Sequence, residues 1–300
     1  MSKMFRTHPL DLHEIRSRIA RSLVLEDLAS CARVSQDWNG SFTPSLYKSI
    51  MLSKHGLSME SVERNKDHIQ HLTVQSTAYD NLSERDEVIS SIMANSVLTT
   101  LSLYLNTIGD SGAEALSKAL KINSTLITLD LQYNSIGPKG AQALSEALKT
   151  NSTLTTLDLW RNSIGENGTW ALSEALKTNS TLTTLKLQGN MIGDNGAQAL
   201  SEALKTNSTL TTLDLEENEI GPNGAQALSE ALKTNLTLTT LNLWCNMIGP
   251  DGAQALAEAL KSNSTLTTLD LRGNWIGDNG TQALSVALKT NSGVTIHIPF

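Results

Sequence analysis

Residues 182–209 read LTTLKLQGNMIGDNGAQALSEALKTNST, and this stretch of 28 residues decides the fold. Its first half, Leu-x-x-Leu-x-Leu-x-x-Asn-x-Ile-Gly, has the pattern of a short strand that ends in a turn. Its second half places Ala and Leu at positions i, i+3, i+4 and i+7 between polar residues, which is the pattern of an amphipathic helix. The stretch therefore predicts one strand followed by one helix.

The same pattern recurs with a period of 28 residues, and seven units fill residues 98–293. Each unit begins at a leucine: Leu98, Leu126, Leu154, Leu182, Leu210, Leu238 and Leu266. A single strand and helix cannot bury both of their leucine rows, whereas stacked neighbours can. The repeat therefore predicts an α/β solenoid, with a parallel sheet on its inner face and helices on its outer face.

One short run inside the first unit could suggest an enzyme. Residues 109–112 read GDSG, the run that surrounds the nucleophile in chymotrypsin-like serine proteases. In the next two units the equivalent residues read GPKG (137–140) and GENG (165–168), so the glycines recur while the residues between them change freely. A nucleophile also needs a base and a group that orients the base. We therefore interpret Ser111 as a variable repeat position and predict that the protein is not an enzyme.

Residues 98–293 resemble the ribonuclease-inhibitor subtype of leucine-rich repeats, a family that also forms the C-terminal arrays of NOD-like receptors. The resemblance implies a horseshoe-shaped protein that binds other proteins. Ile69, Leu72 and Val74 fit the leucine frame, so residues 69–97 are predicted to form an incomplete first repeat. Residues 294–300 are predicted to form a closing strand.

Two asparagine positions recur in the repeat. The first lies where each strand ends, and we expect its buried amide to satisfy backbone groups at Asn106, Asn134, Asn162, Asn190, Asn218, Asn246 and Asn274. The second follows the last helical turn. We expect Asn123, Asn151 and their equivalents to end each helix in a left-handed conformation.

The residues between the strand leucines should point to the inner, concave face. Several are aromatic or arginine, the residue types that anchor protein interfaces. The predicted partner-binding residues are Tyr104, Tyr133, Asp158, Trp160, Arg161, Asp214, Glu216, Glu217, Trp244 and Arg272. The alternative is that these positions are merely solvated. Trp170, on the outer helix face, is expected either to be exposed or to pack against the adjacent helix.

Residues 1–50 do not follow the repeat and read as three short helices, with a connector helix expected at residues 51–68. Residues 8–50 resemble an F-box in the stretches PLDLHEI, DLASCARVSQDW and LYKSI. In that family the helices dock onto a Skp-type adaptor of a cullin-based ubiquitin ligase, and downstream repeats hold the substrate. The resemblance implies that the adaptor-binding residues are Pro9, Leu12, Ile15, Ile19, Leu28 and Val34. The alternative is that they serve only the core of the segment.

Charge and composition limit the remaining functions. The net charge is −7, and residues 67–300 carry thirteen Lys or Arg against twenty-three Asp or Glu, a balance of −10 that disfavours nucleic acid. Cys31 and Cys245 lack the spacing of a metal site or a disulfide framework, which indicates a reducing compartment. No apolar run suits a signal peptide or a membrane span. We expect a cytoplasmic or nuclear protein, monomeric outside its complexes, that binds neither metal nor cofactor.

The predicted function is that of a non-enzymatic adaptor, which recruits a protein on its concave face and presents it for ubiquitination. Two alternatives stay open. In the first, the protein is a plain interaction scaffold and its helical head only caps the repeats. In the second it is a GTPase activator, because the Ran GTPase-activating protein is also an array of this subtype.

Overall fold

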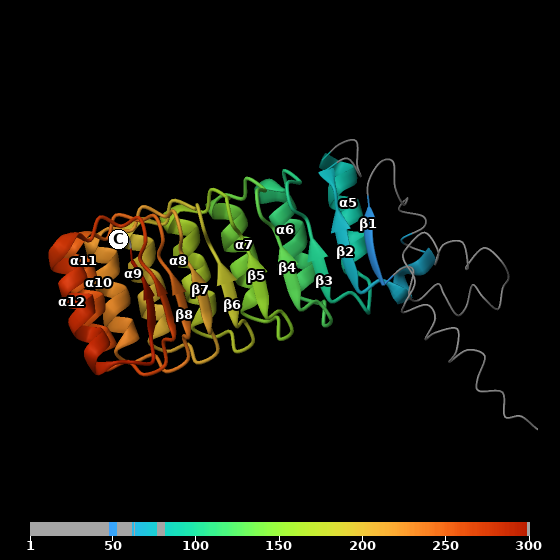
Figure 1. The fold of residues 1–300 in the computed structure, drawn as a ribbon. Helices are drawn as coiled ribbons and strands as arrows, with labels where there is room; N and C mark the ends of the chain where they lie inside the picture. Colours follow the sequence, from blue (N-terminus) through green and yellow to red (C-terminus); the bar gives the residue numbers. More distant parts are fainter. Residues whose placement is uncertain (1–47, 53–61, 63, 77–81, 299–300) are drawn as a thin grey trace, which may run out of the picture.

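The structure is a computed structural model that describes residues 48–52, 62, 64–76 and 82–298 (Figure 1). In these residues ten parallel strands form one sheet in the order of the sequence. The strands are β1 (Ser49–Leu52), β2 (His71–Val74), β3 (Thr100–Ser102), β4 (Thr128–Asp130), β5 (Thr156–Asp158), β6 (Thr184–Lys186), β7 (Thr212–Asp214), β8 (Thr240–Asn242), β9 (Thr268–Asp270) and β10 (Thr295–His297).

The helices cover one face of this sheet and leave the other uncovered (Figure 1). They are α5 (Leu82–Met93), α6 (Gly109–Leu120), α7 (Pro138–Leu148), α8 (Gly165–Leu176), α9 (Gly193–Leu204), α10 (Pro222–Leu232), α11 (Gly249–Leu260) and α12 (Gly277–Thr290), and a short 3-10 helix spans Lys66–His68. The predicted α/β solenoid is therefore confirmed for the repeats. We call the uncovered face of the sheet, with the turns at the ends of its strands, the concave face.

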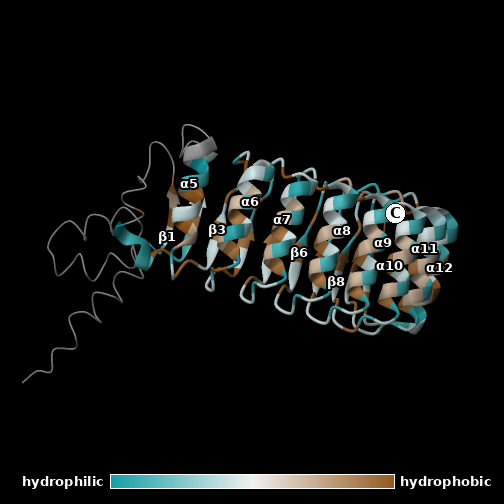
Figure 2. Ribbon diagram, turned by 180° about the vertical axis from the view of Figure 1, so that it is seen from behind, coloured by the Kyte–Doolittle hydropathy of each residue, from teal (hydrophilic) through white to brown (hydrophobic). Residues whose placement is uncertain are grey.

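Each repeat stacks on the next in the same register, because the period does not change. Thr184 of β6 pairs with Thr156 and Thr212, its equivalents in the neighbouring strands. The strand leucine Leu185 and the helix leucine Leu200 are fully buried between sheet and helices. Figure 2 shows the same division, since the helices are apolar toward the sheet and polar outside. The leucine rows thus form one continuous core.

The sheet begins earlier than the sequence predicted. Residues 49–52 form β1, which pairs in parallel with β2, and Ile50 and Leu52 are buried while Met51 is exposed. We expected the helical head to end at residue 50 and a connector helix to begin at residue 51, so this boundary lies inside a strand. The alternation of buried and exposed side chains over Ser49–Leu52 explains the difference, since this short stretch suits a strand at the end of a sheet.

The first asparagine ladder is confirmed. The Nδ2 of Asn190 donates to the carbonyl oxygens of Leu159 in the preceding repeat (2.9 Å) and of Leu187 in its own repeat (3.0 Å). Its backbone N–H donates to Oδ1 of Asn218 in the next repeat (2.9 Å). Each buried amide therefore satisfies backbone groups of neighbouring repeats, as the sequence predicted.

The second asparagine position behaves differently from our prediction. None of Asn123, Asn151 or their described equivalents has a positive φ. Instead these residues form another buried ladder, in which Nδ2 of Asn207 donates to the Leu176 carbonyl of the preceding repeat (2.8 Å). Oδ1 of Asn207 accepts from the backbone N–H of Leu210 (2.8 Å), at the approach to the next strand. The prediction of a left-handed cap was wrong because a cross-repeat hydrogen bond satisfies the end of the helix.

Candidate functional site

The variable residues of the repeats lie on the concave face, at the ends of strands β3–β9 and in the turns that follow. Two side-chain columns are built there. One is two residues beyond each strand, as at Trp160 and Glu216, and the other is the next residue along, as at Arg161 and Glu217. Arg161 and Glu217 have left-handed backbones, with φ of 53° and 54°. The turns thereby carry the two columns side by side across the sheet.

The last residue of several strands is an aspartate, and these aspartates stabilise the turns of the concave face. Oδ1 of Asp158 accepts from the backbone N–H of Trp160 (3.1 Å), and Asp214 and Asp270 accept equivalent bonds in their repeats. Such a bond from a carboxylate to the residue two positions on stabilises a turn. Asp158 is only 5% exposed and also accepts from Gln132 and Lys186, each at 3.0 Å. Asp158 therefore lies beneath the surface as a support for its neighbours.

Three predicted site residues form an aromatic cluster, which we define as Tyr104, Tyr133 and Trp160. The ring centroids of Tyr104 and Tyr133 are 5.6 Å apart, and those of Tyr133 and Trp160 are 5.1 Å apart. The interplanar angles of 78° and 71° are edge-to-face arrangements, which aromatic rings favour. Tyr104 is 43% exposed, and the other two are partly exposed. The cluster is thus a preformed aromatic surface and not part of the core.

The next predicted residues form an ion pair across the sheet. Nη2 of Arg161 contacts Oε2 of Glu217, two repeats further along. Between them lies Gly189, where an added Cβ would be 3.0 Å from Cδ of Arg161. The absence of a side chain at this position therefore lets the arginine extend over the intervening repeat.

Asp214 and Glu216 lie next to this pair, at the end of β7. Asp214 accepts from Nε2 of Gln188 (2.8 Å), and Glu216 accepts from Nδ2 of Asn242 (3.2 Å). Burial raises the pKa of both carboxyl groups above the ordinary values. The negative charges of Asp214, Glu217 and Asp270 raise the pKa of Glu216 further. This part of the concave face is consequently a concentration of negative charge.

Trp244 and Arg272 form the other end of the face. The guanidinium carbon of Arg272 lies 5.2 Å from the ring centroid of Trp244, a cation–π contact. The same guanidinium donates to Asp270 from Nε (3.0 Å) and from Nη2 (2.5 Å), so its orientation is fixed. Trp244 is 41% exposed. The two predicted residues are thus brought together in one preformed contact.

A row of exposed apolar residues in the turns beside the concave face was not predicted from the sequence. Met191, Met247 and Trp275 occupy the position before the buried isoleucine of their repeats, and Trp275 is 78% exposed. Their signal in the sequence was the replacement of small or acidic residues, such as Ser135 and Glu219, at one repeat position. On the helical side, Trp170 is 59% exposed. Of the two expectations for this residue, exposure is therefore confirmed over packing against the adjacent helix.

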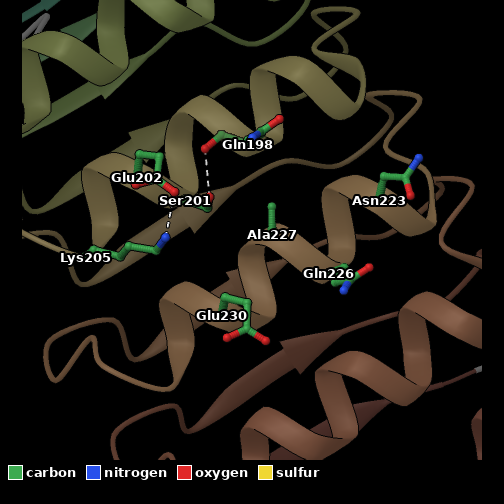
Figure 3. A pocket seen from close by; sticks show the side chains of 8 residues that line it. All are labelled: Gln198, Ser201, Glu202, Lys205, Asn223, Gln226, Ala227 and Glu230. Carbon is green, nitrogen blue, oxygen red and sulfur yellow. Dashed lines mark hydrogen bonds and ion pairs between the residues drawn. The ribbon is translucent and has the colours of Figure 1, made fainter.

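The helical side carries a polar hollow of about 300 Å³ between α9 and α10 (Figure 3). It is lined by Gln198, Ser201, Glu202, Lys205, Asn223, Gln226, Ala227 and Glu230. Nζ of Lys205 pairs with Glu202 (2.6 Å), and the hydroxyl of Ser201 donates to the backbone carbonyl of Gln198 (2.7 Å). Polar groups that line the hollow therefore bind to one another. Because most of these residues recur in other repeats, the hollow is a feature of the scaffold.

The predicted adaptor-binding residues Pro9, Leu12, Ile15, Ile19, Leu28 and Val34 lie outside the described residues. Over the described ranges, no group of three or more His, Cys, Asp or Glu side chains is arranged to hold a metal ion. In the same ranges no helix has both the length and the apolar character needed to span a bilayer.

Comparison with solved structures gives remote likenesses. Leiomodin-1 actin-binding site 2 is 24% identical, with a TM-score of 0.43, and covers 53% of this chain and 91% of its own. The complex of Rad7 and Elc1 in yeast contains a chain that is 14% identical, with a TM-score of 0.48, and covers 95% of this chain and 87% of its own. The comparison with curated proteins gives no match.

Comparison of the sequence with protein families identifies the repeats. A leucine-rich repeat model matches seven segments, at residues 94–117, 123–145, 150–172, 178–201, 206–229, 234–257 and 262–285. These segments together cover more than half of the chain and coincide with the strand–helix units of the solenoid. Repeats of this family form scaffolds for protein interaction. The chain therefore belongs to the leucine-rich repeat family.

Proposed function

We propose that this protein is a non-enzymatic adaptor that holds a protein on its concave face and presents it to a cullin-based ubiquitin ligase through its N-terminal segment. The observation that supports binding of a protein on the concave face is the aromatic cluster of Tyr104, Tyr133 and Trp160. Its rings are exposed at Tyr104 and partly exposed at Tyr133 and Trp160, which core packing does not require, yet they are fixed by mutual edge-to-face contacts. Rigid exposed aromatic side chains bind partners at a low cost in conformational entropy.

The ligase half of the proposal depends on residues 8–50 and their resemblance to an F-box. In such an adaptor the chemistry belongs to the ligase, and the adaptor contributes proximity. Holding the substrate and the ligase on one chain raises the effective concentration of the substrate's lysines near the ligase. The described part of the chain that follows this segment begins with β1, which joins the sheet at residue 49.

The first experiment is co-expression of the full chain with a Skp-type adaptor and a cullin, followed by affinity purification. We expect the complex to form with the parent chain and to be lost in Leu12→Asp and Ile15→Asp. Ser22→Ala, in the same segment, is the matched control and should retain the adaptor. A truncated chain should begin at residue 48, because removal of β1 would expose the edge of β2.

Retention of the adaptor by both aspartate variants, or its absence from the parent complex, would contradict the ligase half. The protein would then be a plain interaction scaffold. In that case the concave face would still be its binding surface, and its helical head would serve only to cap the repeats.

A further inference from the structure

Several carboxylates of the concave face form ion pairs, whereas among the described residues Asp130 at the end of β4 and two carboxylates at the end of β7 have only neutral hydrogen-bond donors as partners. Three ion pairs account for the other carboxylate of the two turn columns, Glu217, and for the two most buried aspartates: Asp158 with Lys186 (3.0 Å), Glu217 with Arg161, and Asp270 with Arg272 (2.5 Å). Asp214 and Glu216 take part in none of these pairs. Among the described residues, their side-chain partners are the neutral amides of Gln188 and Asn242. Two carboxylates at the end of one strand therefore have no direct ion pair, and the nearest cation on the adjacent strand, Lys186, is paired with Asp158.

A second, independent feature at the same place is an acceptor without a donor. Oε1 of Gln188 is buried, and it has no hydrogen-bond partner among the described residues. The Nε2 of the same amide donates to Asp214, so the amide cannot turn over without facing its oxygen toward the carboxylate. A buried acceptor that stays unpaired costs free energy. A donor supplied from outside, after a small shift of the Gln188 side chain, would remove this cost.

The aromatic cluster lies close to these acceptors. Trp160, Gln188 and Glu216 occupy the same column in three consecutive repeats, at the ends of β5, β6 and β7. Neighbouring strands are about 5 Å apart, so two strands separate Trp160 from Glu216 by about 10 Å. An extended chain advances about 3.3 Å per residue, so about three residues span this distance.

We propose that the concave face binds an extended segment of a partner protein, with an apolar side chain on Tyr133 and Trp160 and an arginine or lysine three residues away over Asp214 and Glu216. The inference rests on the proposed function, because it assigns a chemistry to the partner held on this face. A guanidinium or ammonium group has several N–H donors and no acceptor, which suits a site made only of acceptors. An acidic segment would be repelled by the same residues.

The repeats themselves provide conservative variants for the test. Asn242 stands at the position of Asp214 in the next repeat and accepts the same turn-forming hydrogen bond, from the N–H of Trp244 (3.0 Å). Gln132 and Gln188 stand at the position of Glu216 in other repeats. Asp214→Asn and Glu216→Gln should therefore remove charge without removing the fold. Glu202→Gln, on the helical side, removes an equal charge away from the concave face.

The probes are short capped Gly/Ser peptides that carry one Leu and one Arg three residues apart. Matched peptides replace the Arg by Glu, move it next to the Leu, or replace the Leu by Ser. Binding to the full chain is measured by fluorescence anisotropy at low and high salt. We expect the Leu–Arg peptide to bind at least about tenfold more tightly than the Leu–Glu peptide, with an advantage that falls as salt rises.

The double variant Asp214→Asn, Glu216→Gln should lose this advantage, Trp160→Ala should weaken binding of the peptides that carry Leu, and Glu202→Gln should behave as the parent. Equal binding of the Arg and Glu peptides, or stronger binding of the Glu peptide, would overturn the inference while still showing that the face binds protein segments. No binding of any peptide would also overturn it. The ligase half is tested separately, because these measurements contain neither adaptor nor cullin.

Discussion

Arg161 and Glu217 form an ion pair across two repeats, over the backbone of Gly189. The pair is exposed enough that its own contribution to stability should be below about 1 kcal/mol. Its importance is geometric, since it fixes the Arg161 side chain between the aromatic cluster and the acidic residues. The arrangement favours a residue without a Cβ at position 189, where φ is also +61°.

Gly189→Ala should therefore disturb both the backbone and the ion pair. An alanine at positive φ destabilises the fold by about 1 kcal/mol or more, and its Cβ would press on Arg161. Denaturant unfolding of the single variants Gly189→Ala and Arg161→Ala and of the double variant measures the two effects separately. We expect the double variant to be more stable than the sum of the single changes implies. Strict additivity would show that the arginine does not pass over this glycine.

The buried asparagine ladder should be the most sensitive polar feature of the repeats. Asn190→Ala would leave the buried backbone N–H of Ile164 without its amide partner and would remove one of the two amide donors to the Leu159 carbonyl. A buried group left unpaired costs about 1–3 kcal/mol, so the loss of stability should exceed about 1 kcal/mol. The control is Asn195→Ala, which removes an exposed hydrogen bond to Glu166 (3.0 Å). Equal unfolding midpoints for the two variants would contradict a structural role of the ladder.

Most of the fold could be predicted because it depends on the spacing of residues within one repeat. The leucine period determines strand, helix and core, and Asn190 was assigned from its place at the end of a strand. Position 207 was misjudged because its partner, the Leu176 carbonyl, belongs to the preceding helix. A local rule for helix ends carries no information about that neighbour. Strand β1 was missed because Ser49–Leu52 stands outside the period.

The candidate site could be predicted only in part. Residue type and repeat position selected the aromatic residues that meet at Tyr133, and their role in binding stays a prediction. The same reasoning selected Asp158, although that carboxylate is buried beneath the surface. Whether an acidic residue at this column is buried depends on side chains of the adjacent repeats, here Gln132 and Lys186. Contacts between repeats are therefore the information that a single repeat pattern lacks.

A cross-repeat helix cap provides a further prediction. Oδ1 of Asp194 accepts from the backbone N–H groups of Gly221 (2.7 Å) and Gly224 (2.8 Å) at the start of α10 in the next repeat. These N–H groups belong to the first turn and have no partner within the helix. Asp194→Ala should therefore lower the free energy of unfolding by about 1 kcal/mol. Asp278→Ala is the control, because no helix follows α12 in the described chain and Asp278 is exposed. A larger loss in the control would contradict the cap.

The acidic residues of β7 should make stability depend on pH. Burial raises the pKa of Asp214 above 3.8 and that of Glu216 above 4.5, so both carboxyl groups bind their protons more tightly in the folded protein than in the unfolded chain. The resulting stability is fully present below those ordinary pKa values and is lost as the pH rises through the folded-state pKa values. Once the pH exceeds the folded-state pKa values, the parent protein bears the cost of burying two charges.

The variant Asp214→Asn, Glu216→Gln should therefore be more stable than the parent at pH 7, with a difference that shrinks as the pH falls toward about 3.5. Glu258→Gln is a control that should change the stability at pH 7 in the opposite direction. The hydrogen bond from Lys261 lowers the pKa of the exposed Glu258 carboxyl, so removing its charge should reduce stability slightly at pH 7. Denaturant midpoints at the two pH values measure both effects. A double variant less stable than the parent at pH 7 would show that these carboxylates gain more from their amide partners than they lose by burial, and that the β7 surface does not require an external cation.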